Sequence, residues 1–196
     1  MSISKDPIII DTEGGSDFTP IPIAKAGMVG AVFAFVESIG KHEDTYQGVT
    51  KIKDYARIGW ELAQKIDLPG DKYHGKPYLL TRKYTLSMHE KSGLRRMLEE
   101  WRGKKYTKAE VKQGVDLAML IGKQCCINVV HNTASNGNTY ANVGSVSGPM
   151  DGMPELKVEI TELPNWIVEE KRSGGIIIPE TISQPSDGET FDDVPF

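Results

Sequence analysis

The sequence predicts a mainly β domain with a helical insert, followed by a flexible acidic tail. Segments rich in Val, Ile, Phe and Thr recur between turns that contain Gly, Pro or Asn, as is typical of strands. One central segment instead places apolar residues at i, i+3, i+4 and i+7, the spacing of an amphipathic helix. The last ten residues hold four acidic residues and no basic residue. We therefore expect an N-terminal arm over residues 1–26, a β domain over residues 27–178 and a disordered acidic tail over residues 179–196.

The first strand is expected at Met28–Ile39. Both of its faces are mostly apolar, which indicates a central strand of a barrel. Because successive side chains of a strand alternate between faces, Phe33 and Phe35 are predicted to share one face. A polar turn over residues 40–48 is expected to follow.

The second strand is expected at Val49–Ala63, and its alternation separates two faces. One face is largely apolar and includes Ile58 and Trp60, which assigns Trp60 to the core. The opposite face is basic with one aromatic residue, and it consists of Lys51, Lys53, Tyr55 and Arg57. Such a face is either an ordinary solvated surface or a contact surface for a polyanion.

The third strand, expected at Tyr78–Leu86, contains a short run of basic and aromatic residues. This run is Arg82, Lys83 and Tyr84. A similar run lies in a loop after the expected helix, at Lys104, Lys105 and Tyr106. Cations neutralise phosphates and aromatic rings stack on bases, so both runs and the basic face of the second strand are candidate nucleic-acid contacts, with the loop as an outer contact.

The helical insert is expected to begin at Ser87 and to end near Trp101. Ser87 and Glu90 have the spacing of a capping box, and Gly103 is suited to end the helix. The pair Thr107 and Glu110 repeats the capping-box spacing and predicts a short second helix.

Two more strands are expected at Lys123–Thr133 and Thr139–Val146, joined by a hairpin at Asn136-Gly137. The order of three strands, a helix and two strands is that of the OB-fold, a five-stranded barrel whose helix lies between the third and fourth strands. Beyond these elements, Leu156–Ile160 is expected to add a strand, and Trp166–Val168 to cover the barrel.

The charge distribution favours a polyanionic partner. The whole chain has a formal net charge of −4, whereas residues 49–131 contain 17 basic and 9 acidic residues, a net of +8. Cys125 and Cys126 are adjacent in an expected strand and point to opposite faces, so we expect buried, reduced thiols. The sequence has no apolar run long enough to span a membrane and does not begin like a signal peptide. These features predict a soluble cytoplasmic protein.

The chain ends in Asp192, Asp193, Val194, Pro195 and Phe196. A terminal ring, a free carboxylate and two adjacent aspartates suit an exposed hydrophobic pocket rimmed with Arg or Lys. The sequence FDDVPF resembles the acidic tip of bacterial single-stranded DNA-binding proteins. This resemblance implies that the five terminal residues bind replication, recombination and repair proteins while an OB-fold holds the DNA.

The central sequence is similar to a group of bacteriophage single-stranded DNA-binding proteins. The similar segments are YTLSMHEKSGLRRMLEEW at Tyr84–Trp101, LIGKQCCINVVH at Leu120–His131 and NGNTYANV at Asn136–Val143, within residues 28–148. The resemblance implies sequence-independent binding of single-stranded DNA in a bacterial host cell, with host or phage proteins recruited by the tip. The helical insert is longer than a simple OB-fold requires, so DNA contacts of the bacterial proteins cannot be transferred.

Two other functions stay open at this point. The protein could be an adaptor whose tail recruits a partner without binding DNA, or a nuclease-type enzyme with dispersed carboxylates. The sequence contains no GxxxxGK[ST] loop, no HExxH and no paired CxxC, so we expect no catalytic residues, no metal and no cofactor. Self-association and the preference for DNA over RNA are not decided by the sequence.

Overall fold

The computed structural model describes residues 21–173. The acidic tail, its terminal tip and most of the expected N-terminal arm lie outside the described residues. Residues 21–25 have no regular secondary structure, but Ala24 is buried and its carbonyl is 2.7 Å from His131 Nε2. The end of the expected arm therefore packs against the domain.

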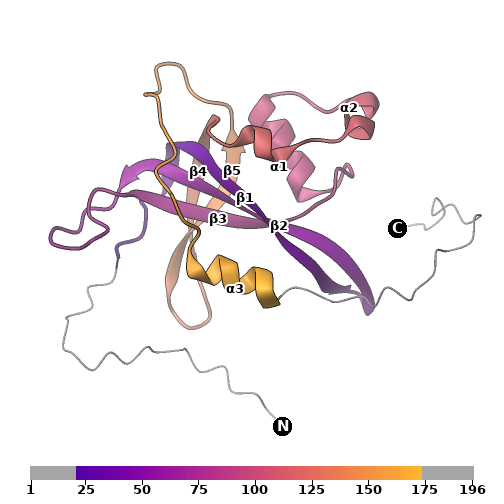
Figure 1. Cartoon of the computed structure of the whole chain (residues 1–196), viewed down its shortest axis with the longest axis horizontal. Coiled ribbons are helices and arrows are strands. Elements are labelled where there is room, and N and C mark those ends of the chain that lie inside the picture. The colour runs from indigo at the N-terminus through magenta and orange to yellow at the C-terminus, as the bar shows by residue number, and fades with distance from the viewer. Residues whose placement is uncertain (1–20, 174–196) are drawn as a thin grey trace, which may run out of the picture.

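Five antiparallel strands form one sheet in the order β3-β2-β1-β4-β5 (Figure 1). The strands are β1 (Gly27–Tyr46), β2 (Val49–Lys65), β3 (Pro77–Thr85), β4 (Gln124–Thr133) and β5 (Thr139–Ser147). Between β3 and β4 the chain forms α1 (Gly93–Arg102), α2 (Lys108–Gln113) and the 3-10 turn η1 (Leu117–Leu120), and α3 (Asn165–Ser173) follows β5. The predicted mainly β class with five strands is confirmed.

The first strand is longer than predicted, because the expected turn over residues 40–48 is wrong, and β2 continues to Lys65 beyond its expected end at Ala63. β1 continues to Tyr46, and only Gln47 and Gly48 form the turn. Both have positive φ, at 49° and 78°, which is the backbone of a two-residue hairpin turn that matches strand twist. Residues 41–54 pair only with each other among the described strands, and we call this two-stranded segment the β1–β2 arm.

Two bulges in β1 change which face each side chain occupies. The register with β2 shifts between Phe33 and Phe35 and again between Ser38 and Gly40, so one extra residue sits in β1 at each point. Phe33 therefore packs in the main core, whereas Phe35 packs in a second cluster with Ala34. The prediction that Phe33 and Phe35 share a face is wrong for this reason.

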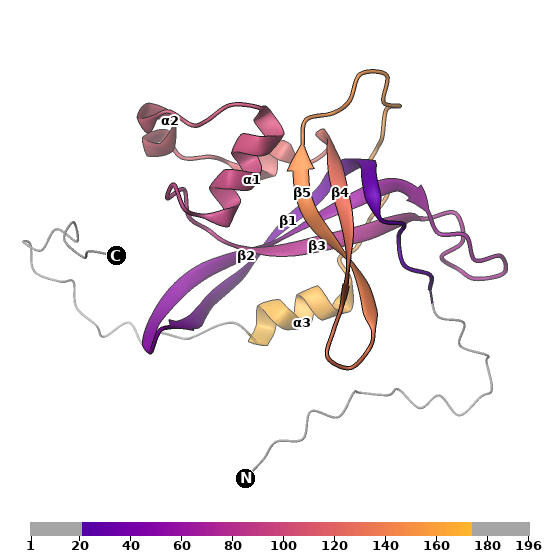
Figure 2. The same ribbon diagram turned by 180° about the vertical axis from the view of Figure 1, so that it is seen from behind.

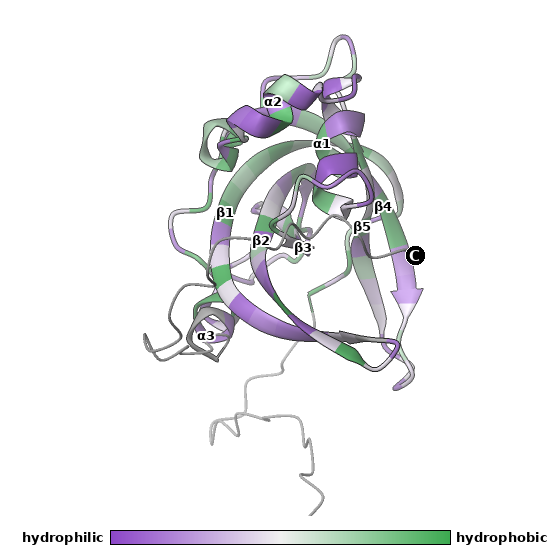
Figure 3. Cartoon of the chain, turned by 90° about the vertical axis from the view of Figure 1, so that its right-hand side faces the viewer, coloured by the Kyte–Doolittle hydropathy of each residue, from purple (hydrophilic) through white to green (hydrophobic). Residues whose placement is uncertain are grey.

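The main core lies on the inner face of the sheet, which α1 covers. Leu94, Met97 and Leu98 of α1 are buried there, as their spacing predicts, and Trp101 stacks on Phe33 with ring centroids 5.6 Å apart. Trp60 is fully buried in the same core. Figure 3 shows the strongly curved sheet from one side, with α1 and α2 at one end and α3 outside β1.

The predicted start of the helical insert at Ser87 is wrong. α1 begins at Gly93 with Ser92 as its N-cap, and it ends as predicted at Gly103, which has φ 70°. Ser87 Oγ instead accepts a hydrogen bond from the backbone N–H of His89, at 3.2 Å. The side chain thus stabilises a local turn, which is the alternative that Ser residues offer to a helix start.

The outer face of the sheet is covered in part by α3 and by the segment before it. Ile167 of α3 is fully buried against Ala34 and Phe35. The strand expected at residues 156–160 is not formed. There, the buried carboxylate of Glu61 accepts the backbone N–H of Glu159 at 2.6 Å, so a side chain takes the place of a strand partner.

The two edge strands, β3 and β5, come into contact because the sheet is curved. Arg82 on β3 spans this seam, and its Nη1 lies 3.0 Å from the carbonyl oxygen of Val143 and 3.3 Å from that of Gly144. Arg82 therefore joins β3 to β5 by donating hydrogen bonds to backbone carbonyl groups of β5.

The two cysteines are buried and form no disulfide, as predicted. Burial raises the pKa of the Cys125 thiol to about 12, so the thiol is protonated and unreactive at neutral pH.

Candidate nucleic-acid interface

The outer face of β2 carries the predicted row of basic and aromatic residues. Lys51, Lys53, Tyr55 and Arg57 all point to this face, because the extra residue at each register shift lies in β1 and β2 keeps its alternation from Lys51 to Arg57. Lys83 of β3 lies directly beside Arg57 in the register and shares the face. Successive rows along a strand are about 7 Å apart, which is close to the spacing of extended nucleotides.

The central ring of this face is Tyr55, which has two neighbours from other strands. The Nζ of Lys83 lies 4.7 Å from the Tyr55 ring centroid, and the His42 ring meets Tyr55 edge-on at 5.6 Å. Tyr55 is partly exposed. A partly exposed ring beside a cation is a suitable platform for a base.

Lys53 lies one row further along the arm and is paired with a carboxylate. Its Nζ is 2.5 Å from Asp44 Oδ2 across the arm. The hydrogen bond from Lys53 lowers the pKa of Asp44, and the same bond raises the pKa of Lys53. Both groups are therefore charged over the whole neutral range, and Lys53 is a permanent cation on this face.

Arg57 is held by α3. Its Nε and Nη2 donate to the two carboxylate oxygens of Glu170 at 2.8 and 2.6 Å, a bidentate ion pair. The guanidinium also lies 5.2 Å from the ring centroid of Trp166, which is 48% exposed. Figures 1 and 2 show α3 beside the sheet, on the side away from α1 and α2.

We call the set His42, Lys53, Tyr55, Arg57, Lys83 and Trp166 the β2 face. Sequence reasoning missed His42 and Trp166. His42 lies in a segment expected to be a turn, and its contact with Tyr55 depends on the β1 strand continuing. Trp166 meets Arg57 because α3 packs beside the sheet, where Glu170 binds Arg57 although the two residues are 113 positions apart in the chain. The sequence carries no local signal for such a contact.

The run Arg82, Lys83 and Tyr84 is divided between the two faces, and only Lys83 belongs to the β2 face. Tyr84 is 5% exposed and packs in the main core, and burial raises the pKa of its hydroxyl. Arg82 is engaged at the seam between β3 and β5. Lys51 is exposed in the arm, opposite Asp44 in the register.

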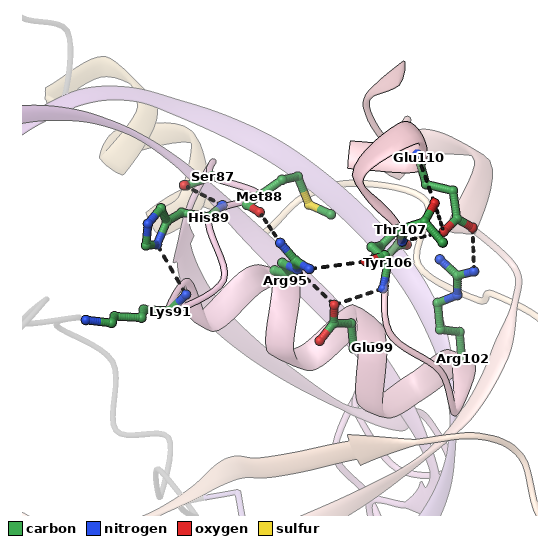
Figure 4. Close-up of polar contacts among 10 residues, drawn as sticks. All are labelled: Ser87, Met88, His89, Lys91, Arg95, Glu99, Arg102, Tyr106, Thr107 and Glu110. Atoms are coloured by element: carbon green, nitrogen blue, oxygen red, sulfur yellow. Dashed lines mark hydrogen bonds and ion pairs between the residues drawn. The ribbon is translucent and has the colours of Figure 1, made fainter. Parts of the chain in front are cut away.

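The loop with Lys104, Lys105 and Tyr106 joins α1 to α2, and Figure 4 shows Tyr106 among side chains of this helical insert. The Tyr106 backbone N–H donates to Glu99 Oε1 at 2.9 Å, and the Arg102 guanidinium lies 4.1 Å from the Tyr106 ring centroid. Both lysines are exposed. Among the contacts described within residues 21–173, none joins this loop to the β2 face.

The second helix starts with the predicted capping box. Thr107 Oγ1 accepts the backbone N–H of Glu110, and the Glu110 carboxylate accepts the backbone N–H of Thr107 at 2.7 Å. This backbone hydrogen bond, together with that from the Arg102 side chain, lowers the Glu110 pKa to about 2. Hydrogen bonds therefore hold the end of the loop at Tyr106 and Thr107.

A hollow of about 340 Å³ lies elsewhere, between β2 and residues 155–159. Its walls include both Lys65 and Glu159, which form an ion pair, and the buried Glu61. None of the predicted contact residues lines it. The charged side chains that line this hollow thus hold residues 155–159 against β2.

No protein-family model matches the chain, and the search of curated proteins finds no match either. None of the helices within residues 21–173 is long and apolar enough to cross a membrane.

Proposed function

We propose that this protein binds single-stranded nucleic acid, with DNA as the expected ligand, along the β2 face and without sequence preference. The observation that carries the proposal is a set of cations around one aromatic ring on a partly exposed face of the sheet. Lys53, Arg57 and Lys83 supply positive charge, and Tyr55 supplies the ring. Stacking is tolerant of sequence because every base has a π-face.

The strand order and the contact of the edge strands support an OB-fold. In that fold the first strand pairs with the second and the fourth, and the third and fifth strands meet to close the barrel. The β1–β2 arm and the β4–β5 hairpin then correspond to the loops that border the ligand surface of OB-folds. The β2 face adjoins the arm, which is consistent with a strand of nucleic acid lying against it.

The mechanism is occupancy. The lysines and Arg57 replace counterions on successive phosphates, and a base stacks on the Tyr55 ring. A bound strand is kept from refolding and from nucleases. The resemblances of the core and of the tip support a role for this activity in bacteriophage DNA replication, recombination or repair. In this proposal Asp192, Asp193, Val194, Pro195 and Phe196 recruit host or phage partners.

Titration with labelled oligo(dT) and with duplex DNA of the same length tests the proposal. We expect single strands to bind more tightly, with an affinity that falls steeply as salt increases, because phosphate contacts release counterions. Tight binding of an unrelated single-stranded sequence is also expected. An adaptor would bind neither ligand, and a nuclease would degrade the oligonucleotide when Mg²⁺ is added.

A further inference from the structure

The helix α3 lies at one end of the β2 face and engages Arg57 directly. The Arg57 and Glu170 side chains are only 17% and 21% exposed, and two parallel hydrogen bonds join them. Ile167 anchors the same helix against Ala34 and Phe35. The described contacts of the helix with the sheet thus include an apolar anchor and a charged pair.

The contact between Glu170 and Arg57 has the geometry that a phosphate would need. A guanidinium offers two parallel N–H donors to a carboxylate or to a phosphate, and the two anions are bound in the same bidentate way. The Nε and Nη2 donors of Arg57 are both used by Glu170. A nucleic-acid phosphate that binds this edge of Arg57 must therefore displace Glu170.

Lys53 is also paired with a carboxylate, but its partner lies in a different kind of element from the partner of Arg57. Asp44, the partner of Lys53, belongs to β1 and is fixed by the pairing of the arm. Glu170 belongs to a helix outside the sheet, which can leave without breaking any strand pairing. Replacement of the Glu170 carboxylate by a phosphate at Arg57 is thus coupled to movement of the whole helix α3.

We propose that α3 is a displaceable latch in which Glu170 occupies the phosphate position of Arg57, and that bound single-stranded DNA releases the helix from the sheet. This proposal rests on the proposed binding function of the β2 face. α3 is the last element within residues 21–173 and the acidic C-terminal sequence follows it in the chain, so its release adds a helix length of chain between the sheet and the tip. In this proposal, DNA bound on the β2 face therefore lengthens the chain that connects the sheet to the C-terminal tip.

The latch is tested by comparing Glu170→Gln with Glu169→Gln in the full chain. Glu169 precedes Glu170 in the same helix and is exposed, so both variants remove one negative charge from α3. Only Glu170→Gln removes the competitor for Arg57. We expect Glu170→Gln to bind oligo(dT) about five-fold more tightly than Glu169→Gln, at the low end of typical coupling between sites.

A second measurement follows α3 itself by hydrogen exchange of its backbone amides. In the wild-type protein, saturation with oligo(dT) is expected to speed exchange in α3 while β1 and β2 stay protected. Without DNA, Glu170→Gln is expected to speed exchange in α3 relative to Glu169→Gln. Slower or unchanged exchange in α3 on binding would mean that the helix is a fixed wall of the site.

The outcomes separate the latch from the function on which it rests. If the wild-type protein does not bind oligo(dT), the proposed function and the latch both fail. If it binds and the two variants have equal affinity, the latch alone is overturned. Tighter binding by Glu170→Gln, together with faster exchange in α3 on DNA binding, supports the latch.

Discussion

Tyr55 and Tyr84 provide a test that separates surface from core, because the sequence assigns both to nucleic-acid contact and the structure places them on opposite faces. Tyr55 is partly exposed on the β2 face, with Lys83 over its ring. Tyr84 is 5% exposed in the main core. We expect Tyr55→Ala to impair binding with little loss of stability, and Tyr84→Ala to impair stability.

The expected magnitudes follow from these two environments. Loss of one stacking ring costs about 1–3 kcal/mol of binding free energy, which is about 5- to 150-fold in Kd. Replacing a buried aromatic residue by Ala costs about 3–5 kcal/mol of unfolding free energy, since it combines lost transfer energy with a cavity. For a domain of this size, that loss lowers Tm by roughly 10 °C. Tyr55→Ala should change the unfolding free energy by less than about 1 kcal/mol.

Each variant is measured in two assays, thermal unfolding by circular dichroism and oligo(dT) binding by fluorescence anisotropy below the transition. Tyr55→Phe is the matched control, because it keeps the ring and should bind nearly as the parent does. The reasoning is refuted if Tyr84→Ala keeps its Tm and loses affinity, or if folded Tyr55→Ala binds as tightly as the parent.

Three further predictions concern other parts of the molecule. A Cβ on Gly59 would lie 2.1 Å from the Phe35 ring, so Gly59→Ala should cost about 1–3 kcal/mol in urea unfolding, and Phe35→Leu in the same chain should recover part of this loss. The backbone N–H of Thr107, the N-cap of α2, lowers the Glu110 pKa from 4.5 to about 2. The ionised carboxylate therefore contributes stability above pH 4.5, and this contribution is lost as the pH falls toward 2. The greater stability of the parent over Glu110→Gln should therefore be present at about pH 6 and absent at about pH 2 by denaturant unfolding. Lys83→Ala should reduce the slope of log Kd against log salt by about 0.7, the value for one phosphate of a single strand, whereas Lys105→Ala should leave the slope unchanged.

The elements of the sheet could be predicted because their signals are local. Alternating side chains identify the strands, and the spacing of Leu94, Met97 and Leu98 identifies the buried stripe of α1. Element boundaries depended on weaker signals. Ser87 and Ser92 are both acceptable N-caps by residue type, but Ser87 Oγ accepts the His89 amide of a local turn, and α1 begins after Ser92, whose side chain makes no capping hydrogen bond.

The bulges of β1 could not be predicted from the pattern. The sequence around Ala34 reads as an uninterrupted apolar strand, and both faces of that strand are buried. Alternation then carries no information about an inserted residue, since apolar side chains suit either face. The reversal of Phe35 relative to Phe33 becomes visible only when β1 is paired with β2, where Gly59 leaves room for the Phe35 ring.

The candidate site shows why a run of suitable residues is a poor guide to a surface. Arg82, Lys83 and Tyr84 have the same sequence signal, but a strand directs adjacent side chains to opposite faces. Tyr84 therefore enters the core, Lys83 joins the β2 face, and Arg82 turns to the carbonyl groups of β5. The residue types in a segment indicate which ligand chemistry is possible, whereas the two-residue period of the strand decides which of these residues share a face. For that reason the alternating residues of β2, rather than the consecutive runs, give the prediction on which the proposed function depends.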